Sequence, residues 1–121
     1  MTLTGASMKA KASSDVLVGE ALLAQAVEAY VGDRADRQDP RVSPLFGDLA
    51  GLPPVMVQVS SHEVVLDDAT RLAAALGAAD VSVRLEIWGR MPHVWHLYAD
   101  MLGEGREALA QAGDFLRRSL G

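Results

Sequence analysis

Hydrophobic residues change their spacing in the second half of the chain, and the change outlines a strand, a helix and a second strand. Residues 55–59 are almost continuously apolar, as in a buried strand, and two prolines force extended backbone directly before them. Residues 67–76 place apolar side chains on one helical face, and residues 81–88 alternate apolar and polar positions. The order strand, helix, strand predicts a right-handed parallel β-α-β unit, with Gly77 ending the helix.

Helical periodicity also marks both flanks of this unit. Residues 18–30 and 104–120 are predicted to form helices, and residues 94–101 a short one. Gly32 and Asp33 are expected to end the first of these. The expected inner face of the first helix consists of Leu22, Leu23, Ala26, Val27 and Tyr30, and that of the last helix consists of Ala108, Leu109, Ala112, Phe115, Leu116 and Leu120.

Three segments lack such periodicity. Residues 1–15 are small and polar, which predicts a loop or frayed terminus in which Ser14 or Asp15 could cap the helix that follows. Residues 33–40 are charged and end in proline, so we expect a solvated connection. Residues 43–54 are rich in turn formers but carry leucines and Phe46, which indicates a loop pinned to the core.

Composition limits the class of protein. The 121 residues are 50% hydrophobic and 22% charged, which is typical of one globular domain. The net charge of −5 without a basic face argues against nucleic-acid binding. No run reaches about 18 consecutive apolar residues, so no membrane span is expected. The absence of cysteine excludes disulfides, thiolate metal sites and a cysteine nucleophile. No signal peptide is recognisable, which favours the cytoplasm.

The predicted sheet is incomplete, because two parallel strands need further strands or a partner to cover their edges. The fold class is therefore α/β, as a portion of a larger parallel sheet. Residues 1–54 supply a helix and the pinned loop, and residues 55–121 supply the β-α-β-α unit. An exposed edge predicts self-association, and it leaves open that the chain is a non-enzymatic interaction module.

Glu63 and His93 are the candidate catalytic residues. Each follows the carboxyl end of a predicted strand, and adjacent parallel strands present these ends at the same edge of a sheet. A carboxylate there can accept the Nδ1 proton of the imidazole, which leaves Nε2 to act as a general base. The alternative interpretation is an ordinary loop charge beside an ordinary turn histidine.

Other residues near this pair have competing interpretations. His93 and His96, with His62 nearby, could ligate zinc, but the pattern is common by chance and supplies no third ligand. Asp67 is a reserve acid, although its place at a helix N-terminus favours a structural role. Either an acyl pocket or plain core packing would account for the apolar group around the histidine, which consists of Trp88, Met91, Trp95, Tyr98 and Met101.

Three motifs in order resemble the C-terminal third of hormone-sensitive-lipase-like carboxylesterases, a subgroup of the α/β-hydrolase fold. The resemblance runs from about residue 4 to residue 120. In that subgroup an acid opens an acid-x-x-x-Asp-[Asp/Glu] segment after one strand and a histidine follows the next strand. The three motifs here are Ser43-Pro44-Leu45-Phe46-Gly47-Asp48-Leu49-Ala50-Gly51-Leu52-Pro53-Pro54, then Glu63-Val64-Val65-Leu66-Asp67-Asp68, then Gly89-Arg90-Met91-Pro92-His93.

The resemblance implies serine carboxylic-ester hydrolysis without a cofactor, with Glu63 as the acid, His93 as the base and a small ester as substrate. Departures are the glutamate where aspartate is usual, and Val94-Trp95 where the histidine is often followed by Gly-Phe. The Gly-x-Ser-x-Gly and His-Gly-Gly-Gly motifs of the fold are absent from the 121 residues. We therefore expect a C-terminal fragment that is inactive alone, with Met1 in the loop after the sixth strand of the complete sheet.

Overall fold

The computed structural model of the chain describes residues 3–32 and 36–121. The predicted strands and helices between residues 55 and 120 are confirmed in type, with small shifts of their bounds. The elements in order are α1 (Ala6–Ala10), α2 (Glu20–Val31), η2 (Pro44–Phe46), β1 (Val55–Ser60), α3 (Leu66–Ala78), β2 (Val83–Trp88), η3 (Trp95–Tyr98) and α4 (Gly103–Leu120). Gly77 lies inside α3 rather than ending it, and the short helix expected at residues 94–101 is the four-residue 3-10 helix η3.

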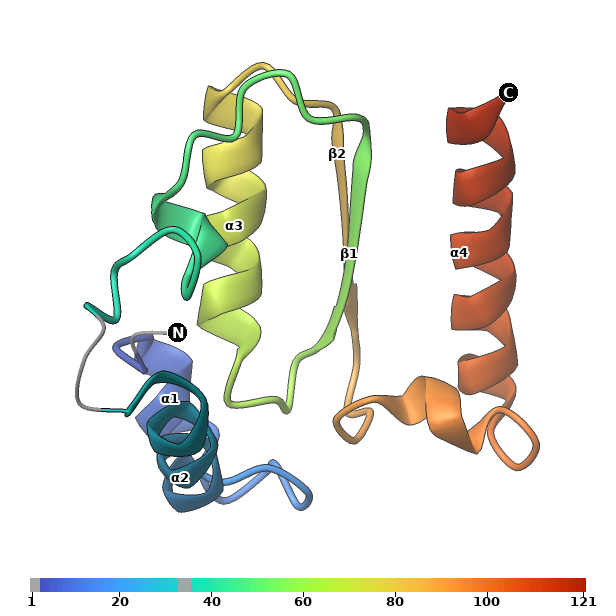
Figure 1. The fold of residues 1–121 in the computed structure, drawn as a ribbon. Helices are drawn as coiled ribbons and strands as arrows, with labels where there is room; N and C mark the ends of the chain where they lie inside the picture. The colour runs from blue at the N-terminus through green and yellow to red at the C-terminus, as the bar shows by residue number, and fades with distance from the viewer. Residues whose placement is uncertain (1–2, 33–35) are drawn as a thin grey trace.

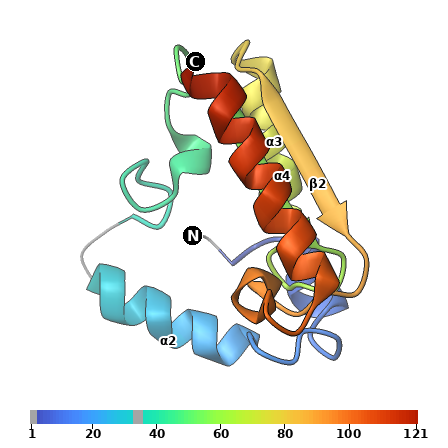
Figure 2. The same cartoon turned by 90° about the vertical axis from the view of Figure 1, so that its right-hand side faces the viewer.

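The sheet consists of β1 and β2 within the part of the chain that the structure describes. The strands run parallel, as predicted, with Val55 opposite Val83 and Ser60 opposite Trp88. The helices α3 and α4 lie on opposite sides of this pair (Figure 1). Seen from the α4 side, α4 runs alongside β2 with α3 behind it (Figure 2). The arrangement has three layers, α3, the sheet and α4. Because the strands are parallel, their carboxyl ends lie at the same end of the sheet.

The face of the sheet under α3 forms the apolar core. Leu76 of α3 and Val81 before β2 are buried together with Leu49, which comes from the loop before β1. Val55 and Val83 pack against this cluster from the strands. The prediction that residues 43–54 form a loop pinned to the core is confirmed at Leu49, whereas Phe46 is 38% exposed. Burial of a leucine side chain contributes roughly 2 kcal/mol.

The face of the sheet under α4 is polar at its centre. Gln58 lies opposite Glu86 in the register, and its amide nitrogen donates to a Glu86 oxygen at 2.9 Å and to the Ala108 carbonyl at 3.0 Å. Ala108 is fully buried, but Leu116 is 53% exposed and Leu120 is 82% exposed. The predicted inner stripe of the last helix is therefore wrong at Leu116 and Leu120 and at Leu109, which is 48% exposed, whereas Ala112 and Phe115 are partly buried.

The N-terminal segment differs most from its prediction. Residues 6–10 form α1 instead of a frayed loop, and the Met8 side chain is 2% exposed. The helix α2 begins after Gly19 with no side-chain cap, so neither Ser14 nor Asp15 caps it. Its predicted inner face is wrong at Tyr30, which is 80% exposed, because α2 buries only Val27 among the described residues.

The charged connection after α2 is only partly described. Residues 36–38 and 40 are exposed, as expected for a solvated segment, whereas residues 33–35 and the expectation that Asp33 helps to end the helix lie outside the described residues. The expectation about Met1 lies outside them as well. Across residues 3–32 and 36–121, none of the helices has the length and apolarity needed to cross a bilayer.

Candidate active site

Glu63 lies just beyond the end of β1 in a tight turn back onto the strand. The Ser60 amide donates to Oε1 of Glu63 at 2.6 Å, and the Glu63 amide donates to the Ser60 carbonyl at 3.2 Å. Glu63 is 4% exposed and Ser60 is fully buried. A buried carboxylate is stable only when its oxygens are hydrogen-bonded, and the strand end supplies one of these bonds.

His93 supplies the second bond. Its Nδ1 atom lies 2.5 Å from Oε2 of Glu63, and its side chain is 31% exposed against 5% for the glutamate. The loop that carries it is tied to the loop of Glu63, because the Arg90 amide donates to Ser61 Oγ at 3.1 Å. The two residues that the sequence predicted to lie together are therefore in contact.

The contact determines which ring nitrogen of His93 carries the proton. An ionised carboxylate can only accept, so Nδ1 must be the donor, and Nε2 is then the basic nitrogen of the neutral ring. A short N–H···O⁻ bond of this kind holds both the tautomer and the ring orientation. The geometry has the form of an acid–histidine pair that can take a proton from a hydroxyl group.

Val94, directly after His93, lies in the left-handed backbone region with φ 50° and ψ 41°. This conformation is rare for a β-branched side chain, because its Cβ crowds the following carbonyl. The next residue, Trp95, is 1% exposed and fixes the chain beyond the turn. The strained residue thus lies between the candidate base and a buried anchor, which is where strain is often retained for function.

A hollow of about 290 Å³ opens beside the pair, along the outer side of β1. Apolar side chains from β1, α3 and the histidine loop make most of its wall. Its lining residues are Val57, Gln58, Val59, Glu63, Val65, Asp68, Ala69, Leu72, His93, Val94, Trp95 and His96. A largely apolar hollow with few polar groups is typical of sites for small organic ligands.

His96 is bonded to the sheet and stacked on a neighbouring aromatic ring. Its Nε2 lies 2.9 Å from Oε1 of Gln58, and its ring lies 4.2 Å from that of Trp95. Burial lowers the pKa of His96, and the nearby charge of Glu63 opposes this. Within residues 3–32 and 36–121, no three histidine, aspartate or glutamate side chains form a metal-binding group. The zinc alternative has no third ligand there.

The remaining sequence candidates, His62 and Asp67, make hydrogen bonds elsewhere. The His62 amide donates to Ser60 Oγ at 3.1 Å, and Asp67 accepts from the Ala6 amide at 3.1 Å. Asp67 is therefore not needed as a reserve acid, because Glu63 already holds the histidine. The expected apolar group around the histidine is only partly formed: the rings of Trp88 and Trp95 lie 5.8 Å apart, but Met101 is 76% exposed.

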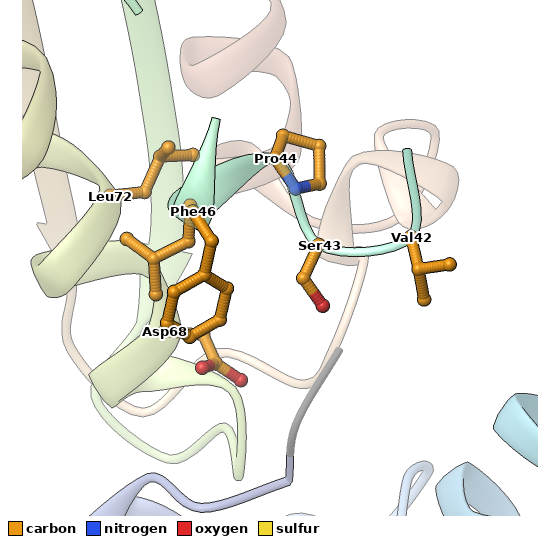
Figure 3. A pocket seen from close by; sticks show the side chains of 7 residues that line it. Val42, Ser43, Pro44, Phe46, Asp68 and Leu72 are labelled. Atoms are coloured by element: carbon orange, nitrogen blue, oxygen red, sulfur yellow. The ribbon is translucent and has the colours of Figure 1, made fainter. Parts of the chain in front are cut away.

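A second hollow of about 210 Å³ lies between the η2 loop and α3. Figure 3 shows Phe46 and Leu72 at its wall with the Asp68 carboxylate near the phenyl ring. The Asp68 Oδ2 atom is buried without a hydrogen-bond partner among the described residues, and Oδ1 lies 3.8 Å from an Arg71 nitrogen. This hollow shares Asp68 and Leu72 with the first, but neither Glu63 nor His93 lines it.

Two residues that sequence reasoning missed hold the loop of Glu63 from the N-terminal segment. Ser7 and Asp15 are 7% and 9% exposed, and both bond to the backbone of Val64. The hydrophobic pattern contains no sign of this, because polar residues in a polar stretch read as a solvated loop. Only the burial of two polar side chains reveals their role.

Comparison with known proteins places the chain in a family. The sequence profile of the alpha/beta hydrolase fold matches residues 1–97. An acetyl-hydrolase of Streptomyces hygroscopicus is 43% identical over 97% of this chain and 39% of its own length. An esterase of Acinetobacter venetianus is 36% identical over 95% of this chain and 38% of its own length. The chain thus spans about two fifths of the length of these curated relatives.

Solved structures agree with these relatives. An esterase from the bacterial hormone-sensitive lipase family superposes with a TM-score of 0.96 at 42% identity, over 100% of this chain and 40% of that protein. The expected resemblance to this group of esterases is confirmed, and so is the assignment of the two strands to part of a larger α/β sheet. The chain belongs to the alpha/beta hydrolase fold family.

Proposed function

We propose that this chain supplies the acid and the base of a Ser–acid–His triad that hydrolyses carboxylic esters. Glu63 is the orienting acid and His93 is the general base. The observation that carries the proposal is the 2.5 Å contact between Glu63 Oε2 and His93 Nδ1 beside an apolar hollow. Esterase names among the relatives support the same reaction.

The nucleophile has to come from outside these 121 residues, which contain no Gly-x-Ser-x-Gly sequence. In the proposed reaction His93 Nε2 takes the serine proton while the serine oxygen attacks the ester carbonyl. The imidazolium then gives that proton to the departing alcohol. Water, deprotonated by the same nitrogen, releases the acid and restores the serine. Throughout, Glu63 stabilises the charged ring and keeps Nε2 directed at the reacting oxygen.

The proposed substrate is an ester with a short acyl chain, and no cofactor is required for this chemistry. One relative is named an acetyl-hydrolase, and a similar esterase structure at 39% identity was soaked with p-nitrophenyl butyrate.

The test uses the chain alone and inside a complete enzyme. The purified chain should not hydrolyse p-nitrophenyl butyrate, because it lacks the nucleophile and the oxyanion donors. A chimera in which residues 4–120 replace the matching two fifths of the hormone-sensitive-lipase-family esterase should be active. In the chimera, His93→Ala should lower kcat by about 10⁴-fold or more, and Glu63→Ala by about 10³–10⁴-fold.

The matched control in the chimera is His62→Ala, which removes a neighbouring histidine that bonds through its backbone amide and carbonyl. This variant should keep most of the activity. An active chimera that is indifferent to His93→Ala would contradict the proposal. So would turnover by the isolated chain that His93→Ala abolishes, because the chain would then hold its own nucleophile.

We also propose that the isolated chain self-associates through the outer edge of β1. The amides of Val55 and Ser61 donate to the carbonyls of Ser82 and Trp88 on the β2 side. Backbone groups alternate along a strand, so those of Met56 and Gln58 point toward the outer edge. An uncovered strand edge is a template for another strand. Met56→Pro removes an outward amide without breaking the β1–β2 ladder. Light scattering after gel filtration should show concentration-dependent oligomers that Met56→Pro reduces; a monomer at all concentrations would contradict this.

A further inference from the structure

We propose that Ser7 and Asp15 are positioning residues that fix the acid loop, defined as residues 61–65 between β1 and α3, so that Glu63 meets His93. Both side chains come from the N-terminal segment, and both are buried. The inference rests on the proposed function, because it assigns a role in the orientation of the proposed acid. Ser7 and Asp15 lie outside the three sequence motifs that surround the proposed site.

Asp15 holds the amide next to the acid. Its Oδ2 accepts from the Val64 amide at 3.0 Å, while Oδ1 accepts from the Leu17 amide at 3.2 Å and the Val18 amide at 3.0 Å. Both oxygens of a carboxylate that is 9% exposed are therefore bonded to backbone amides. Bonds from amides to an ionised carboxylate are stronger than neutral ones, so this residue joins two backbone segments firmly.

Ser7 holds the carbonyl of the same residue. Its hydroxyl donates to the Val64 carbonyl at 2.6 Å and accepts from the Asp67 amide at 2.9 Å. Val64 is 1% exposed, and both of its backbone polar groups are bonded to this segment. Ser7 therefore links the acid loop to the first turn of α3 and leaves the residue after Glu63 little freedom to move.

Two further contacts extend the attachment to both sides of Glu63. Ser14 Oγ donates to the His62 carbonyl at 3.0 Å, and the Ala6 amide donates to Asp67 Oδ2 at 3.1 Å. Gly5 permits this approach, since a Cβ there would lie 3.0 Å from the Cβ and Oδ2 of Asp67. The residues immediately before and after Glu63 are thus held from one segment.

Positioning matters here because the Glu63–His93 hydrogen bond joins two separate loops. A hydrogen bond weakens steeply when donor and acceptor move out of line, so a displaced acid loop loses it. Supporting bonds that lock the backbone of a site residue are the usual means of holding a catalytic geometry to within about half an ångström. Loss of the Asp15 or Ser7 bonds should let the acid loop move and weaken the contact while the sheet stays intact.

The experiment follows the Nδ1 proton of His93 by NMR in the full 121-residue chain with labelled histidine. A strong Nδ1–H···carboxylate bond gives a far-downfield proton resonance, which Glu63→Gln should abolish. Asp15→Ala and Ser7→Ala should shift this resonance upfield or broaden it beyond detection, at temperatures where circular dichroism shows a folded chain. Asp15→Asn, which keeps one acceptor oxygen, should retain part of it.

The matched controls remove similar bonds elsewhere. Asp48 accepts from the Ala50 amide at 3.0 Å, and Ser43, buried at 5% exposure, donates to the Arg37 carbonyl at 2.7 Å. Asp48→Ala and Ser43→Ala should leave the His93 resonance in place even where they lower the melting temperature. If Ser7 and Asp15 had a purely structural role, their alanine variants would also lower the melting temperature and leave the His93 resonance in place.

The outcomes separate this inference from the proposed function. If Glu63→Gln abolishes the resonance but folded Asp15→Ala and Ser7→Ala keep it, the positioning role is overturned and the triad proposal stands. If the wild-type resonance does not depend on Glu63, the triad proposal fails. Hydrogen exchange at the Val64 amide then still reports whether Asp15 holds the loop. If Asp15→Ala does not fold, Ser7→Ala decides the question.

Discussion

Glu63 and Ser60 are hydrogen-bonded in both directions, with the Ser60 amide at 2.6 Å from Oε1 and the Glu63 amide at 3.2 Å from the Ser60 carbonyl. The reciprocal pair fixes the acid against the end of β1 and leaves Oε2 for His93. One side chain thus connects the backbone of the strand to the candidate base. The two oxygens of one carboxylate therefore have different partners.

Shortening this side chain should therefore break one of the two bonds. Glu63→Asp removes one methylene, so the carboxylate cannot reach the Ser60 amide and His93 together. The free energy of unfolding should fall by about 1–3 kcal/mol, since a buried polar group loses its partner. Urea denaturation measures the change. Glu107→Asp, on the surface of α4, is the control and should change stability by less than about 0.5 kcal/mol; equal effects in both variants would contradict the argument.

Relief of strain after the histidine should stabilise the chain. Val94→Gly removes a β-branched Cβ from a residue at φ 50°, where glycine is unstrained. The strain of about 1–2 kcal/mol outweighs the added chain entropy of glycine, so the free energy of unfolding should rise by about 1 kcal/mol. Chemical denaturation checks this. Val94→Ala keeps a Cβ and should gain less, whereas a loss of stability in Val94→Gly would show that the strain argument is wrong.

The contact of α4 with η3 requires a glycine. A Cβ on Gly105 would lie 2.9 Å from the Trp95 carbonyl oxygen and 3.0 Å from the Ala99 Cα, both of which are backbone atoms that cannot rotate away. Gly105→Ala should destabilise the chain by about 1–3 kcal/mol despite its better helix propensity. Thermal unfolding followed by circular dichroism measures it.

Gly113 in the same helix is the matched control. A Cβ there would meet only a terminal nitrogen of the Arg117 side chain, at 3.6 Å. Gly113→Ala should therefore raise stability by up to about 1 kcal/mol from helix propensity alone. A gain for both alanine variants would mean that α4 moves freely away from η3.

Stability should depend on pH through His96. Burial lowers the pKa of His96 in the folded chain, so the unfolded chain binds the proton more readily. The stability that neutral His96 contributes is fully present above the pKa of the unfolded chain, about 6.5. It is lost as the pH falls through the lower pKa of the folded chain. Urea denaturation from pH 8 to pH 5 should therefore show a loss of stability toward acid.

His96→Gln tests the assignment of that loss. Glutamine can still donate to Oε1 of Gln58, which accepts from His96 Nε2 at 2.9 Å, but it does not titrate. The variant should therefore show a flatter dependence between pH 7 and pH 5. An unchanged slope would assign the acid sensitivity to other groups.

The local elements and the candidate pair followed from the sequence. The spacing of apolar residues identified β1, α3 and β2, because helices and strands expose side chains with different periods. Parallel strands present their carboxyl ends at one edge, so Glu63 after β1 and His93 after β2 could be brought together without coordinates. The motifs around them carried the resemblance that the profile match then confirmed.

The tertiary structure decided how the flanks are used. Ser7 and Asp15 bond to Val64 across separations of 57 and 49 residues, and no periodic pattern records contacts between polar residues so far apart. The exposure of Leu116 and Tyr30 could not be predicted either. An apolar stripe shows which face of a helix is apolar, but it does not show which segment packs against that face. Local sequence determines which face of an element is apolar, whereas burial depends on which distant segments pack against that face.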